Sequence, residues 1–305
     1  GTRHLVVGTT STAGGDLVTE QDAWHLGWCT KSLTAAVYAR LVETGRATWT
    51  ATVAELVPDV MPHPAWAERS VAELFWCRAG VAANLPSEQV DGWHADRRTL
   101  PEQRTTATAA ALAVPPLNPG RFVYSNLGYV VAGAAIDRIA GSWEGALRSE
   151  LLEPAGVTCG FGPPARILGH RPKWRIGGLL LGRGRPAEPD SADADNPPVL
   201  SSAGTLVMSL PDWARMHRMF HADAPGPLSG PSISRMMAVP EGGQMGMGWG
   251  RDRDGRPGVQ GSNTLWSATA LMSRDRSRTA LVVANDGRTR VLTASVSLAL
   301  QLLAD

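Results

Sequence analysis

Apolar side chains recur every three or four residues in several parts of the chain, which predicts helices. Ser209 precedes one of these segments as a helix cap, and Gly141 ends another. The longer helices are expected at 30–44, 125–141, 209–220 and 290–304, and shorter ones at 53–57, 70–76 and 104–112. Most of this helical pattern lies in the middle of the chain.

Runs with strand character lie near both ends of the chain. They are rich in β-branched and apolar residues, are separated by turn residues, and occupy 2–10, 245–252, 264–273 and 279–287. Residues 159–200 are rich in Gly, Pro, Arg and Asp, so we expect a long, mostly irregular insertion of the kind that forms lids. The pattern predicts an α/β (α+β) fold, in which segments from the two chain ends form one antiparallel sheet.

The chain is long enough to bury a large core in one domain, 1–305. We expect a sheet subdomain from about 1–50 and 240–305, flanked by helices. A mostly helical subdomain with the lid-like insertion is expected over about 51–239. Only one strand is expected before the segment 27–35, which leaves one edge of the sheet exposed. A second subunit could cover that edge, so a homodimer is an open alternative.

Composition excludes several classes of function. The 29 basic and 28 acidic residues give a net charge of +1, which provides no basic field for nucleic acid. No apolar run is long enough to span a bilayer, so no membrane partner is expected and a cytoplasmic location is the default. Cys29, Cys77 and Cys159 are widely spaced, and the seven histidines lack metal-ligand spacing. We therefore expect no disulfide framework, no metal and no cofactor.

Three blocks carry the candidate chemistry: "GWCTKSLTA" at 27–35, "FVYSNLGYVVAGAAID" at 122–137 and "QGSNTLWSATALMS" at 260–273. In this order they resemble the serine β-lactamase and penicillin-binding-protein superfamily. The nearest resemblance is to class C β-lactamase-like esterases, the family VIII carboxylesterases. It covers nearly the whole chain, and it implies a β-lactamase/transpeptidase-like fold.

The resemblance also implies roles for individual residues. In such families the Ser of an S-x-x-K motif attacks the acyl carbon, and its Lys takes the proton. Lys31 matches that Lys, while Tyr124 and Asn126 match a Tyr-x-Asn motif that relays the proton. Gly261 matches the Gly of the strand motif, and the Ser262 amide matches one oxyanion donor.

Three positions depart from the family pattern. Trp28 stands where the nucleophilic Ser is expected, Val259 where the strand motif has Lys or His, and Cys77 where relatives carry His. An indole cannot attack a carbonyl, and Val has neither charge nor proton to offer. The inherited covalent mechanism is therefore expected to be broken at two independent points.

Cys29 and Ser125 are the alternative nucleophiles. A thiol at a helix N-terminus ionises readily, but Cys29 and Lys31 are two residues apart, a spacing at which helical side chains do not face each other. A hydrogen bond within the site is the simpler role for Ser125. A further alternative is a remnant network in which Lys31, Tyr124 and Asn126 bond one another.

The leading hypothesis is an enzyme that performs non-covalent acid–base catalysis on a small organic substrate, in bacterial specialised metabolism. Cyclisation, isomerisation, elimination and hydration each fit, with Lys31 as base, Tyr124 as acid and Asn126 orienting one of them. The expected substrate-binding residues are Trp28, Cys29, Trp76, Trp249, Val259, Gly261, Ser262 and Trp266. The alternatives are an inactive pseudo-hydrolase that binds a ligand or protein, and a hydrolase or acyltransferase that uses Cys29 or Ser125.

Overall fold

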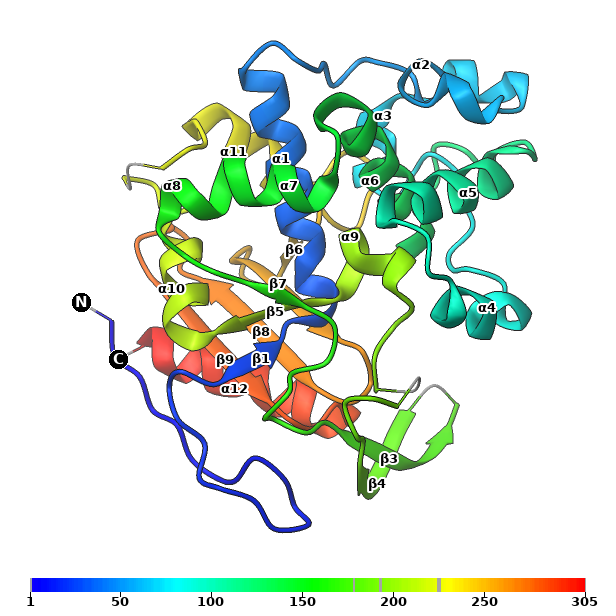
Figure 1. Ribbon diagram of the computed structural model, residues 1–305. Coiled ribbons are helices and arrows are strands. Elements are labelled where there is room, and N and C mark those ends of the chain that lie inside the picture. Colours follow the sequence, from blue (N-terminus) through cyan, green and yellow to red (C-terminus); the bar gives the residue numbers. More distant parts are fainter. Residues whose placement is uncertain (1, 178, 192–193, 224–225, 305) are drawn as a thin grey trace.

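The computed structural model describes residues 2–177, 179–191, 194–223 and 226–304. Its main sheet is antiparallel and is built from C-terminal segments in the order β6-β7-β8-β9. These strands are Gly250–Arg251, Pro257–Ser262, Ser267–Met272 and Thr279–Ala284. The last helix, α12 (Thr289–Ala304), packs on β8 and β9, where Ala299 and Leu303 meet Leu271 and Ala280. The expected mixed α/β fold is confirmed (Figure 1). The expectation that segments from both chain ends form one sheet is wrong, because the N-terminal strand pairs with a central segment in a separate sheet.

A second, three-stranded sheet joins distant parts of the chain. Its order is β1-β5-β2, with strands Ala23–His25, Leu206–Ser209 and Gly160–Phe161. The strand expected at 2–10 is wrong, because that segment forms only an isolated bridge between Thr9 and Leu17. Leu5 and Val7 are 84% and 79% exposed, and the run has strand propensity without a partner strand in the described structure.

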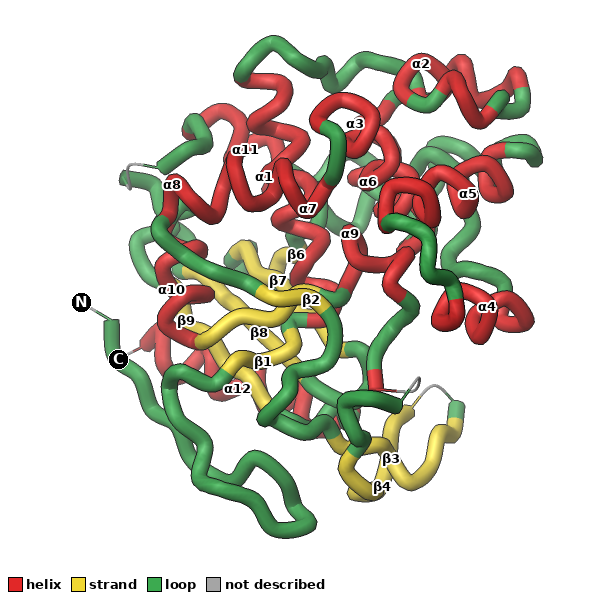
Figure 2. The backbone as a smooth tube through the Cα atoms, viewed as in Figure 1, coloured by secondary structure: helices red, strands yellow, loops and turns green. Residues whose placement is uncertain are grey.

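The helical block is centred on α1 (Thr30–Glu43) and α6 (Asn126–Ala140), which are buried along nearly their whole length. Figure 2 shows this block above the strands. The expected helices are confirmed, with bounds that differ by a few residues. The others are α2 (Val53–Leu56), α3 (Val71–Phe75), α4 (Val90–Ala95), α5 (Leu100–Leu112), α7 (Trp143–Leu147), α8 (Glu153–Ala155), α9 (Ser201–Gly204), α10 (Leu210–Arg218) and α11 (Gly230–Met237).

The insertion at 159–200 is more regular than expected. It contains a hairpin of β3 (His170–Ile176) and β4 (Leu179–Pro186), so the prediction of a mostly irregular segment is wrong there. Lys173 to Ile176 alternate polar and apolar side chains, which is a strand pattern. The many Gly and Pro residues around this short run obscure that signal.

Several tryptophans are packed in the hydrophobic core, and two of them surround a buried histidine. His217 lies among Trp213, Phe220 and Trp249, with ring centroids 5.4, 5.9 and 5.9 Å away, respectively. Burial lowers the pKa of His217 to about 3, so this histidine is neutral in the folded chain at neutral pH.

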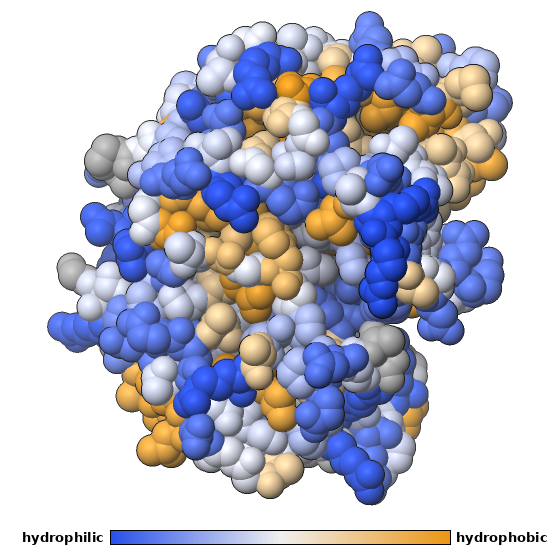
Figure 3. Space-filling view, viewed as in Figure 1, coloured by the Kyte–Doolittle hydropathy of each residue, from blue (hydrophilic) through white to orange (hydrophobic). Residues whose placement is uncertain are grey.

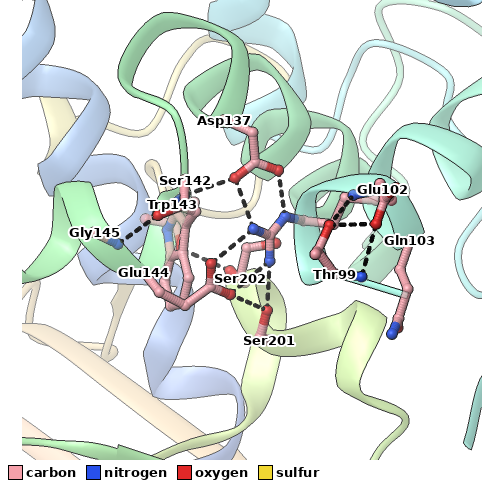
Figure 4. Close-up of polar contacts among 12 residues, drawn as sticks. Thr99, Glu102, Gln103, Asp137, Ser142, Trp143, Glu144, Gly145, Ser201 and Ser202 are labelled. Carbon is pink, nitrogen blue, oxygen red and sulfur yellow. Dashed lines mark hydrogen bonds and ion pairs between the residues drawn. The ribbon is translucent and has the colours of Figure 1, made fainter. Parts of the chain in front are cut away.

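A buried ion cluster ties α5, α6, α7 and α9 together. The guanidinium of Arg104, which is fully buried, donates to Asp137 and Glu144 at 2.7–2.8 Å and to the hydroxyl of Ser201 at 2.7 Å. Figure 4 shows Asp137, Glu144 and Ser201 converging on this position. Burial disfavours the charged guanidinium, but the bonds to Glu144 and Asp137 outweigh it and raise the pKa of Arg104.

The surface is mixed. Figure 3 shows hydrophilic residues over most of one face, with patches of hydrophobic residues, one of them near the middle. Among the described residues, no helix combines the length and apolar character needed to cross a membrane.

Candidate active site

The entry to α1 is held against β7 by two glycines. After β1, the chain makes a short 3₁₀ turn, Gly27–Cys29, in which Gly27 has φ of +52°. A Cβ on Gly27 would lie 2.6 Å from the Ser262 nitrogen, and one on Gly261 would lie 2.6 Å from the Trp28 nitrogen. Only glycine allows this approach, which brings the backbone around the Trp28 and Ser262 amides into contact.

Lys31 lies at the centre of the site and is 1% exposed. Its Nζ donates to the Ala203 carbonyl at 3.1 Å. The Nζ also lies 4.0, 5.1 and 5.5 Å from the ring centroids of Trp28, Tyr124 and Tyr129. Burial lowers the pKa of Lys31 well below its ordinary value of 10.5, although the surrounding rings favour a cation. The environment therefore favours the neutral amine.

Trp28 covers this amine. A Cβ on Gly204 would lie 2.3 Å from the Trp28 indole, so the ring packs directly on the backbone at the end of α9. The same indole stands over the Lys31 Nζ. The side chain of Trp28 thus fills the space between Gly204 and Lys31.

Tyr124 and Asn126 differ in their exposure and in their contacts. Tyr124 is 38% exposed as a residue, while burial of its phenol group raises its pKa. The Asn126 amide donates to Asn84 at 2.6 Å, and its Oδ1 is buried without a partner among the described residues. No hydrogen bond joins Lys31, Tyr124 and Asn126 to one another in the described structure, so the remnant network among them is wrong.

The two alternative nucleophiles are both engaged in structural contacts. The Cys29 thiol is buried, approaches the Ala268 carbonyl at 3.6 Å, and has a pKa raised by burial, which opposes formation of a thiolate. The Ser125 hydroxyl donates to the Ala82 carbonyl at 2.7 Å and accepts from the Gly128 amide at 2.8 Å. Ser125 therefore caps α6, as its simpler expected role requires.

The remaining candidates contact other parts of the chain. Val259 is buried in the main core and pairs with Ala270 across the sheet. Trp249 is fully buried in the cluster around His217, and Trp76 lies beside Arg235 of α11. Trp266 is buried in a second cluster and donates to the Ile167 carbonyl at 3.0 Å. These contacts are structural ones.

Three residues near Lys31 were not among the predicted site residues. Tyr129 is fully buried and donates its hydroxyl to the Phe75 carbonyl at 2.8 Å. Cys77 adopts φ of +54°, which is uncommon outside glycine, and burial raises its pKa. Gly204 ends α9, where its backbone packs against the Trp28 ring. For Tyr129, its place one helical turn after the Tyr-x-Asn motif was the available signal.

Two cavities lie elsewhere. One of about 360 Å³ lies between β9 and α12, lined by Val282, Arg290, Val291, Ala294, Ser295 and Leu298. The other, of about 350 Å³, is lined by residues that include Asp59, Pro101 and Arg138. The described residues hold no cluster of three or more side chains suited to a metal ion.

Gly204→Ala should destabilise the chain by about 1–3 kcal/mol, because the new methyl group collides with the Trp28 ring. In a Trp28→Ala background most of that cost should vanish. Chemical denaturation of the four proteins gives the coupling energy. Gly92→Ala in α4 is the matched control, since a Cβ there meets nothing within 4 Å. A cost of Gly204→Ala that persists without Trp28 would contradict this packing.

Several solved structures share this fold. SurE is 26% identical with a TM-score of 0.73, and the match covers 95% of this chain and 66% of that chain. This chain therefore spans slightly less than two thirds of the length of SurE. The D-amino acid amidase from Ochrobactrum anthropi SV3, complexed with L-phenylalanine amide, is 19% identical with a TM-score of 0.75, covering 98% and 88% of the two chains. A D-stereospecific amidohydrolase from Streptomyces sp. is 19% identical with a TM-score of 0.69, covering 92% and 87%.

The two lower identities show a shared fold and nothing more. No curated protein matches the chain. A family model described as Beta-lactamase matches residues 2–302, which is nearly the whole sequence. The chain therefore belongs to the β-lactamase family.

Proposed function

We propose that this chain binds a small organic molecule without forming an acyl-enzyme. The observation that carries the proposal is the position of Trp28, whose indole lies 4.0 Å from the Lys31 Nζ. The family resemblance puts the nucleophile at this position, three residues before the lysine. An indole has no nucleophilic oxygen or sulfur for covalent catalysis.

The close backbone contact between Gly27 and Gly261 suggests the chemistry of the ligand. Amides at the start of a helix lack intrahelical acceptors and favour an anionic or carbonyl oxygen. The Trp28 amide has this position, and the Ser262 amide lies across the glycine contact. Among the similar structures, SurE was determined with D-Leu and the Ochrobactrum amidase in complex with D-phenylalanine. We therefore propose a small acyl or amino-acid-like ligand, with D-configured compounds as first candidates.

Exposure favours binding over turnover. A general base must lie within hydrogen-bond reach of the proton that it removes. Lys31 is 1% exposed and sealed beneath Trp28, whereas Tyr124 is 38% exposed and can contact a ligand directly. Of the two ionisable side chains in the predicted catalytic set, Lys31 and Tyr124, Tyr124 is therefore the one with surface that a ligand can reach.

Non-covalent acid–base catalysis is the second candidate, and the lowered pKa of Lys31 favours it. A lowered pKa increases the share of the neutral amine, which is the form that acts as a base, with Tyr124 as its acid partner. This reaction requires the Trp28 ring to move away from Nζ. The bacterial biosynthetic setting and the cytoplasmic location stay predictions.

Intact-protein mass spectrometry tests the proposal. After incubation with a fluorophosphonate or a penicillin, we expect no increase in mass, with an active serine amidase as the positive control. An adduct mapped to Cys29, Ser125 or any other residue of the site would contradict the proposal. A covalent enzyme of this family would instead be labelled stoichiometrically.

Binding and turnover are separated with a panel of D- and L-amino acid amides and N-acyl amino acids. We expect a compound from the panel to raise the melting temperature of wild type and not of Tyr124→Ala, without product formation. Product formation that Lys31→Met abolishes would decide for acid–base catalysis instead. If no member shifts the melting temperature, this ligand class is wrong.

A further inference from the structure

The β3–β4 hairpin carries an apolar face that nothing in the described structure covers. Residues paired directly across an antiparallel ladder project from the same face. Trp174 pairs with Leu181 and Ile176 with Leu179, so these four side chains share one face of the hairpin. They are 52%, 38%, 61% and 48% exposed, respectively. Clustered exposure of this kind marks an interaction surface.

The same hairpin is strongly basic. Residues 170–186 contain five of the 29 basic residues and none of the 28 acidic ones, although the whole chain carries only +1. Lys173, Arg175 and Arg185 are exposed, and no ion pair joins them to a described residue. The Lys173 Nζ lies 4.7 Å from the Trp174 ring centroid, which places a positive charge beside the apolar face.

The hairpin lies at the periphery of the molecule. Figure 1 shows β3 and β4 at the lower right, away from the helical block. The Leu180 amide donates to the Thr289 hydroxyl at 3.1 Å, which fixes the turn end of the hairpin to the start of α12. A hairpin held at the periphery in this way can present one face to a broad flat surface.

Charge and area decide between possible partners. A second copy docked on this face would bring two basic hairpins together, which electrostatic repulsion opposes. One face of two strands of this length offers a contact area of roughly 250 Å², well below the 800 Å² that each partner buries in a stable protein interface. A lipid bilayer requires no complementary shape. It accepts Trp, Ile and Leu at the level of its headgroups, and anionic lipids attract Lys and Arg.

We propose that the β3–β4 hairpin docks on an anionic lipid surface, with its apolar face entering the interface and its basic residues contacting headgroups. This inference does not depend on the proposed function of the Lys31 site. The sequence analysis expected no membrane partner, because no apolar run is long enough to span a bilayer. Interfacial docking requires no such segment.

Vesicle flotation with the full chain tests the proposal. We expect wild type to float with vesicles of phosphatidylcholine and phosphatidylglycerol at low salt, and not with phosphatidylcholine alone. Ile176→Ser/Leu179→Ser and Lys173→Glu/Arg175→Glu should each reduce the bound fraction by about tenfold or more. Thermal unfolding shows that each variant is folded.

Matched controls change similar residues elsewhere. Leu298→Ser/Leu302→Ser alters exposed apolar residues of α12, and Arg97→Glu/Arg121→Glu alters exposed basic residues outside the hairpin. Both should float like wild type. Wild type that does not bind anionic vesicles, or hairpin variants that bind no worse than the controls, would overturn the proposal. Binding to soluble polyglutamate without binding to vesicles would overturn it in favour of an acidic protein partner.

Discussion

Trp28→Ser is expected to become covalently labelled by a fluorophosphonate, whereas the wild-type chain stays unmodified. The substitution would remove the indole that covers Lys31 and put a hydroxyl beside its amine, whose pKa burial lowers in the wild-type chain. The amides at residues 28 and 262 should stay in place, because Gly27 and Gly261 set their approach. Val259 offers no charged or proton-bearing group, so labelling should be slower than in intact serine hydrolases, by about 10²–10⁴-fold. Peptide mapping locates the adduct.

Two controls separate this chemistry from non-specific reaction. Trp28→Ala opens the same space without a hydroxyl and should stay unlabelled. Adding Lys31→Met to Trp28→Ser should abolish labelling, because the base is lost. A folded Trp28→Ser protein without an adduct, or equal labelling of Trp28→Ala, would contradict the assigned position of the nucleophile.

Arg104→Met is expected to lower the free energy of unfolding by about 3–5 kcal/mol. The substitution leaves the carboxylates of Asp137 and Glu144, which are 6% and 14% exposed, without their shared cation. Burial already raises the pKa of Asp137 despite its bonds to Arg104, so the carboxylate is costly to keep charged. Urea denaturation followed by tryptophan fluorescence measures the change.

Arg138→Met is the matched control. Arg138 pairs with Asp59, but the two side chains are 47% and 75% exposed, and such exposed pairs contribute less than about 1 kcal/mol. Both residues are arginines paired with carboxylates in the helical block, so the comparison isolates burial. Equal losses for Arg104→Met and Arg138→Met would contradict a structural role for the buried cluster.

The sequence predicts the regular parts of this fold well. Helices such as α1, α6 and α12 have apolar residues at helical spacing, and this pattern is local. Pairing between distant segments is not local. The 2–10 run has strand propensity without a partner, whereas the three residues of β1 form a strand because β5 lies beside them. Propensity alone does not distinguish these two cases.

The candidate site shows the same limit. The motifs place Lys31, Trp28 and Tyr124 together. In the structure, the Lys31 Nζ lies 4.0 Å from the Trp28 ring centroid and 5.1 Å from the Tyr124 ring centroid. The motifs do not show that Asn126 bonds Asn84, that Ser125 caps α6, or that Trp249 and Trp266 are buried in other clusters. Those facts depend on the packing of neighbours that are distant in sequence, such as Gly204 against Trp28.

The central claim is that burial beneath Trp28 lowers the pKa of Lys31, and NMR of the lysine side chains tests it most directly. Lys31 and Lys173 are the only lysines, so a chain labelled with [ε-¹³C]lysine gives two signals, and Lys31→Arg assigns them. We predict that Lys31 titrates well below 10.5 in wild type and closer to 10.5 in Trp28→Ser, because water then reaches the amine. A Lys31 that titrates near 10.5 in wild type, or identically in both proteins, would contradict the claim.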